Sequence, residues 1–189
     1  MTSTDNRKTA IQTAVIDLLA REGLKGVTHR AVDTAAGLPQ GSTSYHYPRK
    51  PALLLAAATH LEDLLSKDCA DLQVGFAQAV TQGGIEAGLA FVGAEVLRYT
   101  DGARPHYLAR LELTLAARRD PALAGVGDRL SAATRRPIAF FLELNFNDTS
   151  PAQVEACTGL IDGIMLMHAT GQGPRPSADQ IIAVFRALG

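Results

Sequence analysis

Apolar residues recur along most of the chain at the spacing of one face of an α-helix. Over residues 7–22 the apolar positions are Ile11, Ala14, Val15, Leu18 and Leu19. Steps of three and four residues bring such positions onto one side of a helix. The same spacing returns after Pro51 and continues in several stretches towards residue 188. The pattern therefore predicts an all-α protein.

Glycine and proline divide the first fifty residues into three short helices, predicted at 7–22, 29–36 and 40–46. Gly23 and Gly37 follow the first two helices, where a residue that tolerates positive φ is needed. Thr28 is the predicted N-cap of the second helix, and Pro39 is expected at the first position of the third. The Gly-Ser-Thr-Ser run at 41–44 is a poor helix former, so something other than intrinsic propensity must hold the third helix.

The remainder of the chain is predicted to form one long helix from Pro51, followed by helices near 72–82, 84–100, 104–119, 121–146, 151–171 and 177–188. The breaks between them are marked by residues 83–84, 101–102, 120–121, 147–151 and 171–176, each of which contains a glycine or a proline. About nine to ten helices result in total. A domain boundary near Pro48 would separate a small N-terminal domain, residues 1–48, from a larger helical domain, residues 49–189.

Composition and charge narrow the class of protein. Hydrophobic residues make up 47% of the chain and charged residues 20%, which supports a buried core and excludes general disorder. The chain has no apolar run of membrane-spanning length and no apolar signal segment at its start, so we expect a cytoplasmic protein without a membrane partner. Residues 1–50 carry seven Lys or Arg against four Asp or Glu, whereas the rest carries eleven against fifteen. A basic head on an acidic body suggests that the head meets an anion.

Three short helices, the last two joined by a tight glycine-containing turn, have the plan of a helix-turn-helix. The second helix of that motif enters the major groove and carries short polar side chains that reach base edges. The candidates for base contacts are Gln40, Ser42, Thr43 and Ser44. The candidates for phosphate contacts are Thr28, Arg30, Tyr45, His46, Arg49 and Lys50. Packing of Leu38 and Tyr47 is expected to hold the third helix against the head.

Residues 10–54 resemble the DNA-binding head of the tetracycline-repressor (TetR) family, above all in VTHRAV at 27–32 and AGLPQGSTSYHYPRK at 36–50. The family pattern reads roughly T-x-R-x-V-A-x-x-A-G-V-x-x-G-x-x-Y-x-H/Y-F-x-x-K. Two residues depart from it. Asp33 stands where the family usually has Ala, and Thr43 stands where an aliphatic residue is common. Both are expected to loosen the small core of the motif, unless Asp33 turns outward or caps locally.

The resemblance implies a homodimer that binds double-stranded DNA at a pseudo-palindromic operator and is released by an unknown small-molecule effector. It implies no cofactor and no enzymatic activity. The helices near 121–146 and 151–171 are the expected dimer interface, with the candidates Leu142, Cys157, Gly159, Leu160, Gly163 and Ile164. The alternative is that these glycines pack against the chain's own core. The candidates for the effector pocket are Phe91, Tyr107, Leu111, Leu115, Phe141, Met165 and His168, although such residues are more often plain core.

Catalytic and metal-binding chemistry finds little support in the sequence. The five histidines and two cysteines lack metal-ligand spacing, and a paired acid and base is missing from the larger domain. Two alternatives to a ligand-responsive regulator stay open. One is a helical small-molecule-binding protein or enzyme with a vestigial head. The other is a DNA-binding protein whose larger domain is fully packed and binds no effector.

Overall fold

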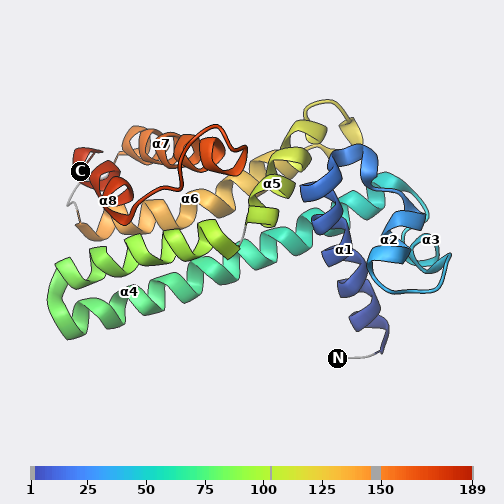
Figure 1. Ribbon diagram of the computed structural model, residues 1–189, viewed down its shortest axis with the longest axis horizontal. Helices are drawn as coiled ribbons and strands as arrows, with labels where there is room; N and C mark the ends of the chain where they lie inside the picture. Colours follow the sequence, from blue (N-terminus) through green and yellow to red (C-terminus); the bar gives the residue numbers. More distant parts are fainter. Residues whose placement is uncertain (1–2, 103, 146–149, 189) are drawn as a thin grey trace. The chain divides into compact units, whose positions relative to one another are not determined.

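The computed structural model describes residues 3–102, 104–145 and 150–188, and within these ranges the chain is helical without a β-strand (Figure 1). The helices are α1 (Ser3–Gly26), α2 (His29–Ala35), α3 (Ser42–His46), α4 (Lys50–Gly102), α5 (Arg104–Ala117), α6 (Val126–Asn145), α7 (Pro151–Ala169) and α8 (Ala178–Leu188). A short 3₁₀ helix, η1 (Pro121–Leu123), precedes α6. The prediction of an all-α protein is confirmed.

The first two helices end and begin close to where the sequence predicts. Gly23 has a φ of 68°, so α1 has a kink there before it ends at Gly26. The hydroxyl of Thr28 accepts a hydrogen bond from the amide of Ala31 at 3.1 Å and caps α2. Gly37, with a φ of 64°, follows Ala36, the C-cap of α2. Both glycines occupy the left-handed region, which is strained for other residues.

The third helix begins later than predicted. Pro39 lies in the turn and its carbonyl accepts from the amide of Ser42 at 3.1 Å. Gly41 is the N-cap of α3 and has a φ of 94°, which a helical residue cannot have. The prediction that Pro39 opens the helix is therefore wrong, because the left-handed Gly41 separates the two.

The long helix α4 reverses direction at a glycine pair, as Figure 1 shows for its green segments. Gly84 has a φ of 74° and Gly83 is also non-helical, which confirms the predicted break. The two halves then pack closely. A Cβ added to Gly75 would lie 2.2 Å from the ring of Phe91, and one added to Gly88 would lie 2.7 Å from the ring of Phe76. Residues 50–82 form one continuous helix, so the predicted start of a new helix at residue 72 is wrong.

The later helices follow the predicted order with different ends. Asp120 caps η1 through the amide of Ala122, and the left-handed Gly125 separates η1 from α6, so the single helix expected over 121–146 is divided. Ser150 and Gln153 form a reciprocal capping box at the start of α7. The predicted break at 147–151 falls largely on residues 146–149, which lie outside the described residues. None of the described helices is long and apolar enough to cross a bilayer.

The chain divides into two compact units. The first unit comprises Met1–Leu64 and Pro105–Ser131, so it includes the three helices of the head, the start of α4, and nearly all of α5. Its core is formed by fully buried aliphatic side chains: Ile11, Val15, Ile16, Leu19, Leu53, Leu61, Leu113, Leu123 and Leu130. Each such side chain contributes roughly 1.5–3 kcal/mol by leaving water. The domain boundary expected near Pro48 thus lies inside the first compact unit.

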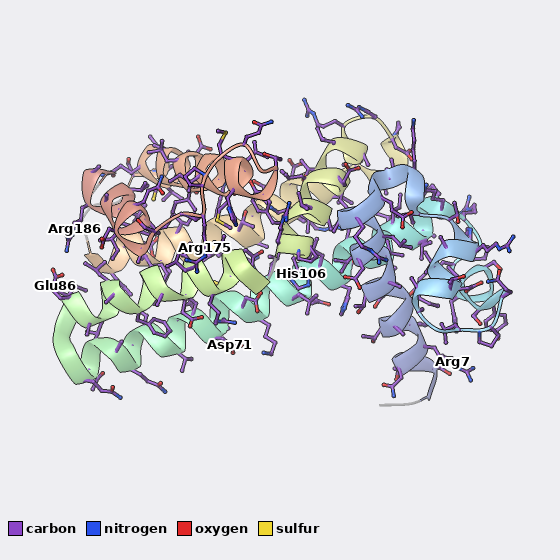
Figure 2. The ribbon with its side chains drawn as sticks, in the orientation of Figure 1. Arg7, Asp71, Glu86, His106, Arg175 and Arg186 are labelled. Atoms are coloured by element: carbon purple, nitrogen blue, oxygen red, sulfur yellow. The ribbon has the colours of Figure 1, made fainter. Side chains whose placement is uncertain are left out.

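The second unit comprises Leu65–Arg104 and Ala132–Gly189. An aromatic cluster fills it, in which the ring centroid of Phe141 lies 5.0 Å from that of Phe76, 5.5 Å from that of Phe140 and 6.1 Å from that of Phe185. Such edge-to-face contacts add to the hydrophobic term. On the surface, Arg186 of α8 pairs with Glu86 of α4 at 3.0 Å (Figure 2).

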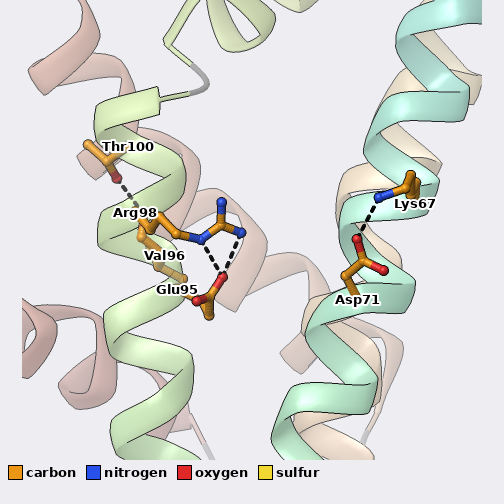
Figure 3. A network of polar contacts seen from close by, with 6 residues as sticks. All are labelled: Lys67, Asp71, Glu95, Val96, Arg98 and Thr100. Atoms are coloured by element: carbon orange, nitrogen blue, oxygen red, sulfur yellow. Dashed lines mark hydrogen bonds and ion pairs between the residues drawn. The ribbon is translucent and has the colours of Figure 1, made fainter.

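Exposed ion pairs line α4 in the second unit. Lys67 pairs with Asp71, four residues later, at 2.8 Å, and Arg98 pairs with Glu95 at 2.7 Å (Figure 3). Pairs of this kind contribute little because water and salt screen them. The second unit is therefore held mainly by its apolar and aromatic core.

We expect Gly84→Ala to lower the free energy of unfolding by about 1 kcal/mol, because Ala has a steric cost at positive φ that glycine does not. Space is not the reason, since a Cβ at Gly84 would meet no atom within 4 Å. Urea denaturation followed by circular dichroism measures the change. Gln82→Ala, an exposed helical position two residues earlier, is the matched control and should stay within about 0.5 kcal/mol of the parent. Equal stability of both variants would contradict the role assigned to Gly84.

Candidate nucleic-acid interface

The candidate interface is built on α2, α3 and the turn between them. α3 has only five residues, and its N-cap Gly41 has no side chain to accept from the free amides of the first turn. The first amides of any helix lack partners inside the helix. A capping group must therefore come from elsewhere in the head.

Asp33 of α2 supplies that group. Its Oδ1 accepts from the backbone amide of Thr43 at 2.7 Å and from the Thr43 hydroxyl at 2.6 Å, and its Oδ2 accepts from the amide of Gly41 at 2.8 Å. Asp33 is 1% exposed and Thr43 is fully buried. The two residues that depart from the expected pattern are thus partners of each other. The two residues do not loosen the core, because the buried carboxylate is hydrogen-bonded rather than orphaned, and of the alternatives stated for Asp33 the local capping role is the one confirmed.

The hydrogen bonds also keep Asp33 ionised. Burial alone would raise the pKa of Asp33, but the hydroxyl and amide of Thr43, the amide of Gly41 and the nearby His29 lower it below its ordinary value. Donors that bond to the charged form of a carboxyl favour that form. A buried, negatively charged side chain therefore stabilises the first turn of α3.

The other end of α3 is anchored by a second contact with α2. His29 Nε2 donates to the carbonyl of Tyr47 at 2.7 Å. The Tyr47 hydroxyl accepts from Gln12 Nε2 of α1 at 3.2 Å, and burial raises the pKa of Tyr47. The packing role expected for Tyr47 is thus accompanied by polar contacts that the sequence did not indicate.

The exposed face of the motif carries most of the predicted base contacts. Gln40 and Ser44 are exposed, and Ser42 is half-buried. The hydroxyls of Ser42 and Ser44 donate to the carbonyls of Pro39 and Gly41, at 2.6 and 3.0 Å, so each hydroxyl oxygen can still accept. Thr43 is the exception. Its side chain is buried and bonded to Asp33, so the prediction that it contacts bases is wrong.

The residues predicted to contact phosphates differ in how far their side chains are exposed. Tyr45 is 83% exposed, the largest exposure among the exposed large hydrophobic side chains described. Its ring meets the ring of His46 edge-on at 5.1 Å. Thr28, Arg30 and Arg49 are exposed, whereas His46 is half-buried.

Lys50 differs from the other cationic candidates because its ammonium has a partner within the chain. Lys50 Nζ donates to the carbonyl of Leu24 at 2.7 Å, and burial lowers the pKa of Lys50. The amide of Leu24 donates to Glu112 Oε2 of α5 at 3.1 Å. Two oppositely charged side chains from α4 and α5 therefore hold the last turn of α1, just after the kink at Gly23.

The dimer candidates divide into an exposed group and a buried group. Gly159, Leu160, Gly163 and Ile164 line one surface hollow of about 470 Å³ on α7, together with Met167, Gly173, Pro174 and Gln180. A Cβ added to Gly159 or Gly163 would meet no atom within 4 Å, so these glycines do not pack against the chain's own core. Leu160 is 50% exposed. Leu142 and Cys157 are buried at 1% and 0% exposure, so the prediction that they face a second subunit is wrong.

The pocket candidates fall into both compact units. Tyr107, Leu111 and Leu115 belong to the first, and Phe91, Phe141, Met165 and His168 belong to the second. Several have core contacts. Phe141 lies in the aromatic cluster, Phe91 packs on Gly75, and Met165 sulfur accepts from the Thr100 hydroxyl at 3.2 Å.

Two of the three pocket candidates in the first unit differ in their exposure. Tyr107 is buried, with the guanidinium of Arg110 4.9 Å from its ring centroid. Leu115 is 51% exposed, which does not fit an enclosed pocket wall.

Metal-binding chemistry finds no support among the described residues, which contain no group of three or more His, Cys, Asp or Glu side chains able to hold an ion. His106 of α5 (Figure 2) has a buried Nδ1 without a hydrogen-bond partner in this part of the chain. Burial raises the pKa of Cys157 to about 11, so this thiol is not a reactive thiolate at neutral pH.

We expect Asp33→Ala to lower the free energy of unfolding at pH 7 by about 3 kcal/mol, because it leaves three donors without their acceptor. Urea denaturation measures the loss. Asp17→Ala removes an exposed carboxylate from α1 and is the control, with an expected change within about 0.5 kcal/mol.

The pH dependence of Asp33→Asn tests the charge itself. Because the folded-state pKa of Asp33 lies below its ordinary value of 3.8, its ionisation stabilises the fold above that pH, and the contribution is lost as the pH falls through the lowered pKa. The stability gap between parent and Asp33→Asn should therefore be widest near pH 7 and should narrow below about pH 4. A constant gap from pH 7 to pH 3 would contradict this account.

Comparisons with known proteins give the family. A model described as the C-terminal domain of tetracycline-repressor-like proteins matches residues 85–188, which is more than half of the chain. No curated protein sequence matches the chain. A TetR-family member from Streptomyces coelicolor A3 aligns with a TM-score of 0.72 and 24% identity, covering 96% of this chain and 97% of that one.

Two further solved structures have the same fold. A TetR-family transcriptional regulator from Rhodococcus sp. aligns with a TM-score of 0.73 and 19% identity, covering 97% of this chain and 98% of that one. The multidrug binding protein EbrR, in complex with ethidium, aligns with a TM-score of 0.67 and 24% identity, covering 97% of this chain and 98% of that one. The chain therefore belongs to the tetracycline-repressor-like family of transcription regulators.

Proposed function

We propose that the chain is a transcriptional repressor that binds a pseudo-palindromic operator as a homodimer and releases it when a small-molecule effector binds. The observation that carries this proposal is the exposed face of α3. Tyr45 is 83% exposed beside the exposed Ser44, while the opposite side of the same helix is tied to α2 through Thr43. A short polar helix whose inner side is bonded to the neighbouring helix can present its exposed side to a major groove.

The proposed DNA contacts fall into two groups. Gln40, Ser42 and Ser44 are proposed to meet base edges, since an amide pairs with adenine and a hydroxyl can pair with several bases. Thr28, Arg30, Tyr45, His46 and Arg49 are proposed to bind phosphates and so to position the head. Lys50 joins this group only if DNA displaces its contact with Leu24.

The hollow on α7 supports a proposed interface with a second copy of the chain. Leu160, Leu166 and Met167 are 50%, 42% and 45% exposed. Two glycines on the same helix leave open space where a partner helix can approach closely. A two-fold axis through this surface would make it self-complementary, as a pseudo-palindromic operator requires.

The effector is proposed to be a small organic molecule. The solved structures of EbrR, which is described as a multidrug binding protein, include complexes with ethidium, proflavin and malachite green. In this chain Phe91, Phe141, Met165 and His168 remain the candidates of the second unit, and Tyr107 and Leu111 those of the first. Effector and operator would each weaken the binding of the other by the same factor. A regulator of this type acts in the cytoplasm and is not an enzyme.

DNA binding is tested with the duplex upstream of the protein's own gene and its neighbours. The affinity should fall steeply with salt, because each phosphate contact releases counterions. Tyr45→Phe should weaken binding to all sequences alike, whereas Gln40→Ala should change the preferred sequence at a cost of about 1–3 kcal/mol for the affected base. Fluorescence anisotropy over a salt series measures both effects. Binding that is independent of salt, or a Gln40→Ala variant with unchanged preference, would contradict the assignment.

The dimer interface is tested with Leu160→Glu. A carboxylate at this position, which lines the hollow, should raise the dissociation constant of the dimer at least about 30-fold, because the charge would be desolvated in the interface. Val74→Glu is the matched control, since Val74 is 58% exposed on α4 of the same unit. Analytical ultracentrifugation distinguishes the 20.0 kDa chain from its dimer. A Leu160→Glu variant that dimerises as tightly as Val74→Glu would place the interface elsewhere.

A further inference from the structure

We propose that Asp33 and Thr43 are positioning residues that set the rotation and depth of α3 for reading DNA sequence. This inference rests on the proposed DNA-binding function. Neither Asp33 nor Thr43 is proposed to touch DNA bases, since both side chains are buried. Their role is to determine where the exposed side chains of α3 point.

The short helix α3 cannot position itself. It has five residues, and its ends are joined by backbone bonds from Tyr45 to Gly41 and from Tyr47 to Thr43. Its first turn also bonds to Asp33, which accepts from Gly41 and twice from Thr43. Three hydrogen bonds donated to one carboxylate fix a direction as well as a distance, because hydrogen bonds weaken steeply when bent.

The contact with Asp33 also sets the rotation of α3 about its own axis. Successive residues of an α-helix are turned by about 100°, so Tyr45 points about 200° away from Thr43. Thr43 is fully buried while Tyr45 is 83% exposed, which matches this geometry. The hydroxyl that binds Asp33 therefore determines which way Tyr45 and Ser44 face.

A second contact, at the C-terminal end of α3, prevents the helix from shifting as a whole when Asp33 is changed. His29 Nε2 donates to the carbonyl of Tyr47 at 2.7 Å, so α2 holds α3 at both ends. A change of one methylene at Asp33 displaces one end while the other stays fixed, which tilts the helix. Recognition geometry tolerates errors of only about 0.5 Å and 10–20°, so a tilt should alter base contacts more than phosphate contacts.

The experiment compares Asp33→Glu, Thr43→Val and Thr43→Ser in the full chain. Asp33→Glu keeps the charge and the acceptors but adds a methylene. Thr43→Val keeps the shape but removes the hydroxyl, and Thr43→Ser keeps the hydroxyl as the control. The probe is a duplex that the parent protein selects from a random-sequence pool. The readout is the ratio of dissociation constants between this duplex and its single-base variants, measured on protein shown to be folded by circular dichroism.

We expect Thr43→Ser to keep the ratio within threefold of the parent. Asp33→Glu and Thr43→Val should each lower it at least tenfold, while the slope of log affinity against log salt stays unchanged because the phosphate contacts remain. A merely structural role would lower stability and leave the ratio of the folded protein unchanged. The proposal would therefore be overturned if folded Thr43→Val and Asp33→Glu had the same ratio of dissociation constants as the parent. If Asp33→Glu does not fold, the ratio of Thr43→Val alone decides.

Amide hydrogen exchange without DNA separates this proposal from the proposed function. The amides of Gly41 and Thr43 should exchange at least tenfold faster in Asp33→Glu and Thr43→Val than in the parent, and equal rates would overturn the positioning role. If the parent protein selects no duplex, the repressor function fails and the reading role fails with it. The exchange rates then still decide whether Asp33 holds α3.

Discussion

A helix of five residues cannot persist alone in water, because helix nucleation is unfavourable and so short a helix gains few hydrogen bonds. α3 meets this constraint with a buried carboxylate from its neighbour rather than with its own sequence. Asp33 accepts three hydrogen bonds from the turn and first residues of α3, and these bonds keep the carboxylate charged inside the head. The small, polar surface that faces outward is possible because the stabilising contacts lie on the inner side.

The sequence predicted those features that depend on one segment at a time. The spacing of Ile11, Val15 and Leu19 identifies the buried face of α1, and all three are at most 1% exposed. The glycine pair at 83–84 identifies the reversal of α4, since tolerance of positive φ is readable from residue type. Periodicity and backbone tolerance are local properties, which explains why the all-α class and the order of the helices could be predicted.

The predictions that were wrong concern features that depend on contacts with residues distant in sequence. Thr43 looked like a base contact because it stands in a polar run, but its hydroxyl faces Asp33, ten residues earlier. Cys157 shares a helix with the exposed Gly159 and Gly163 yet lies on its buried side, because the sequence alone did not determine which face of α7 meets the core. A single sequence gives the residue types of a site, whereas their orientation follows from packing.

Leu24 illustrates the same principle at the link between helices of the first unit. Its amide binds Glu112 of α5 and its carbonyl binds Lys50 at the start of α4. Both side chains are charged, and hydrogen bonds to charged groups are stronger than those between neutral groups. The last turn of α1, which leads towards α2, is therefore held by two helices that are distant in sequence, so its position depends on theirs. In this unit the orientation of the head follows from contacts with α4 and α5 as well as from the helix-turn-helix itself.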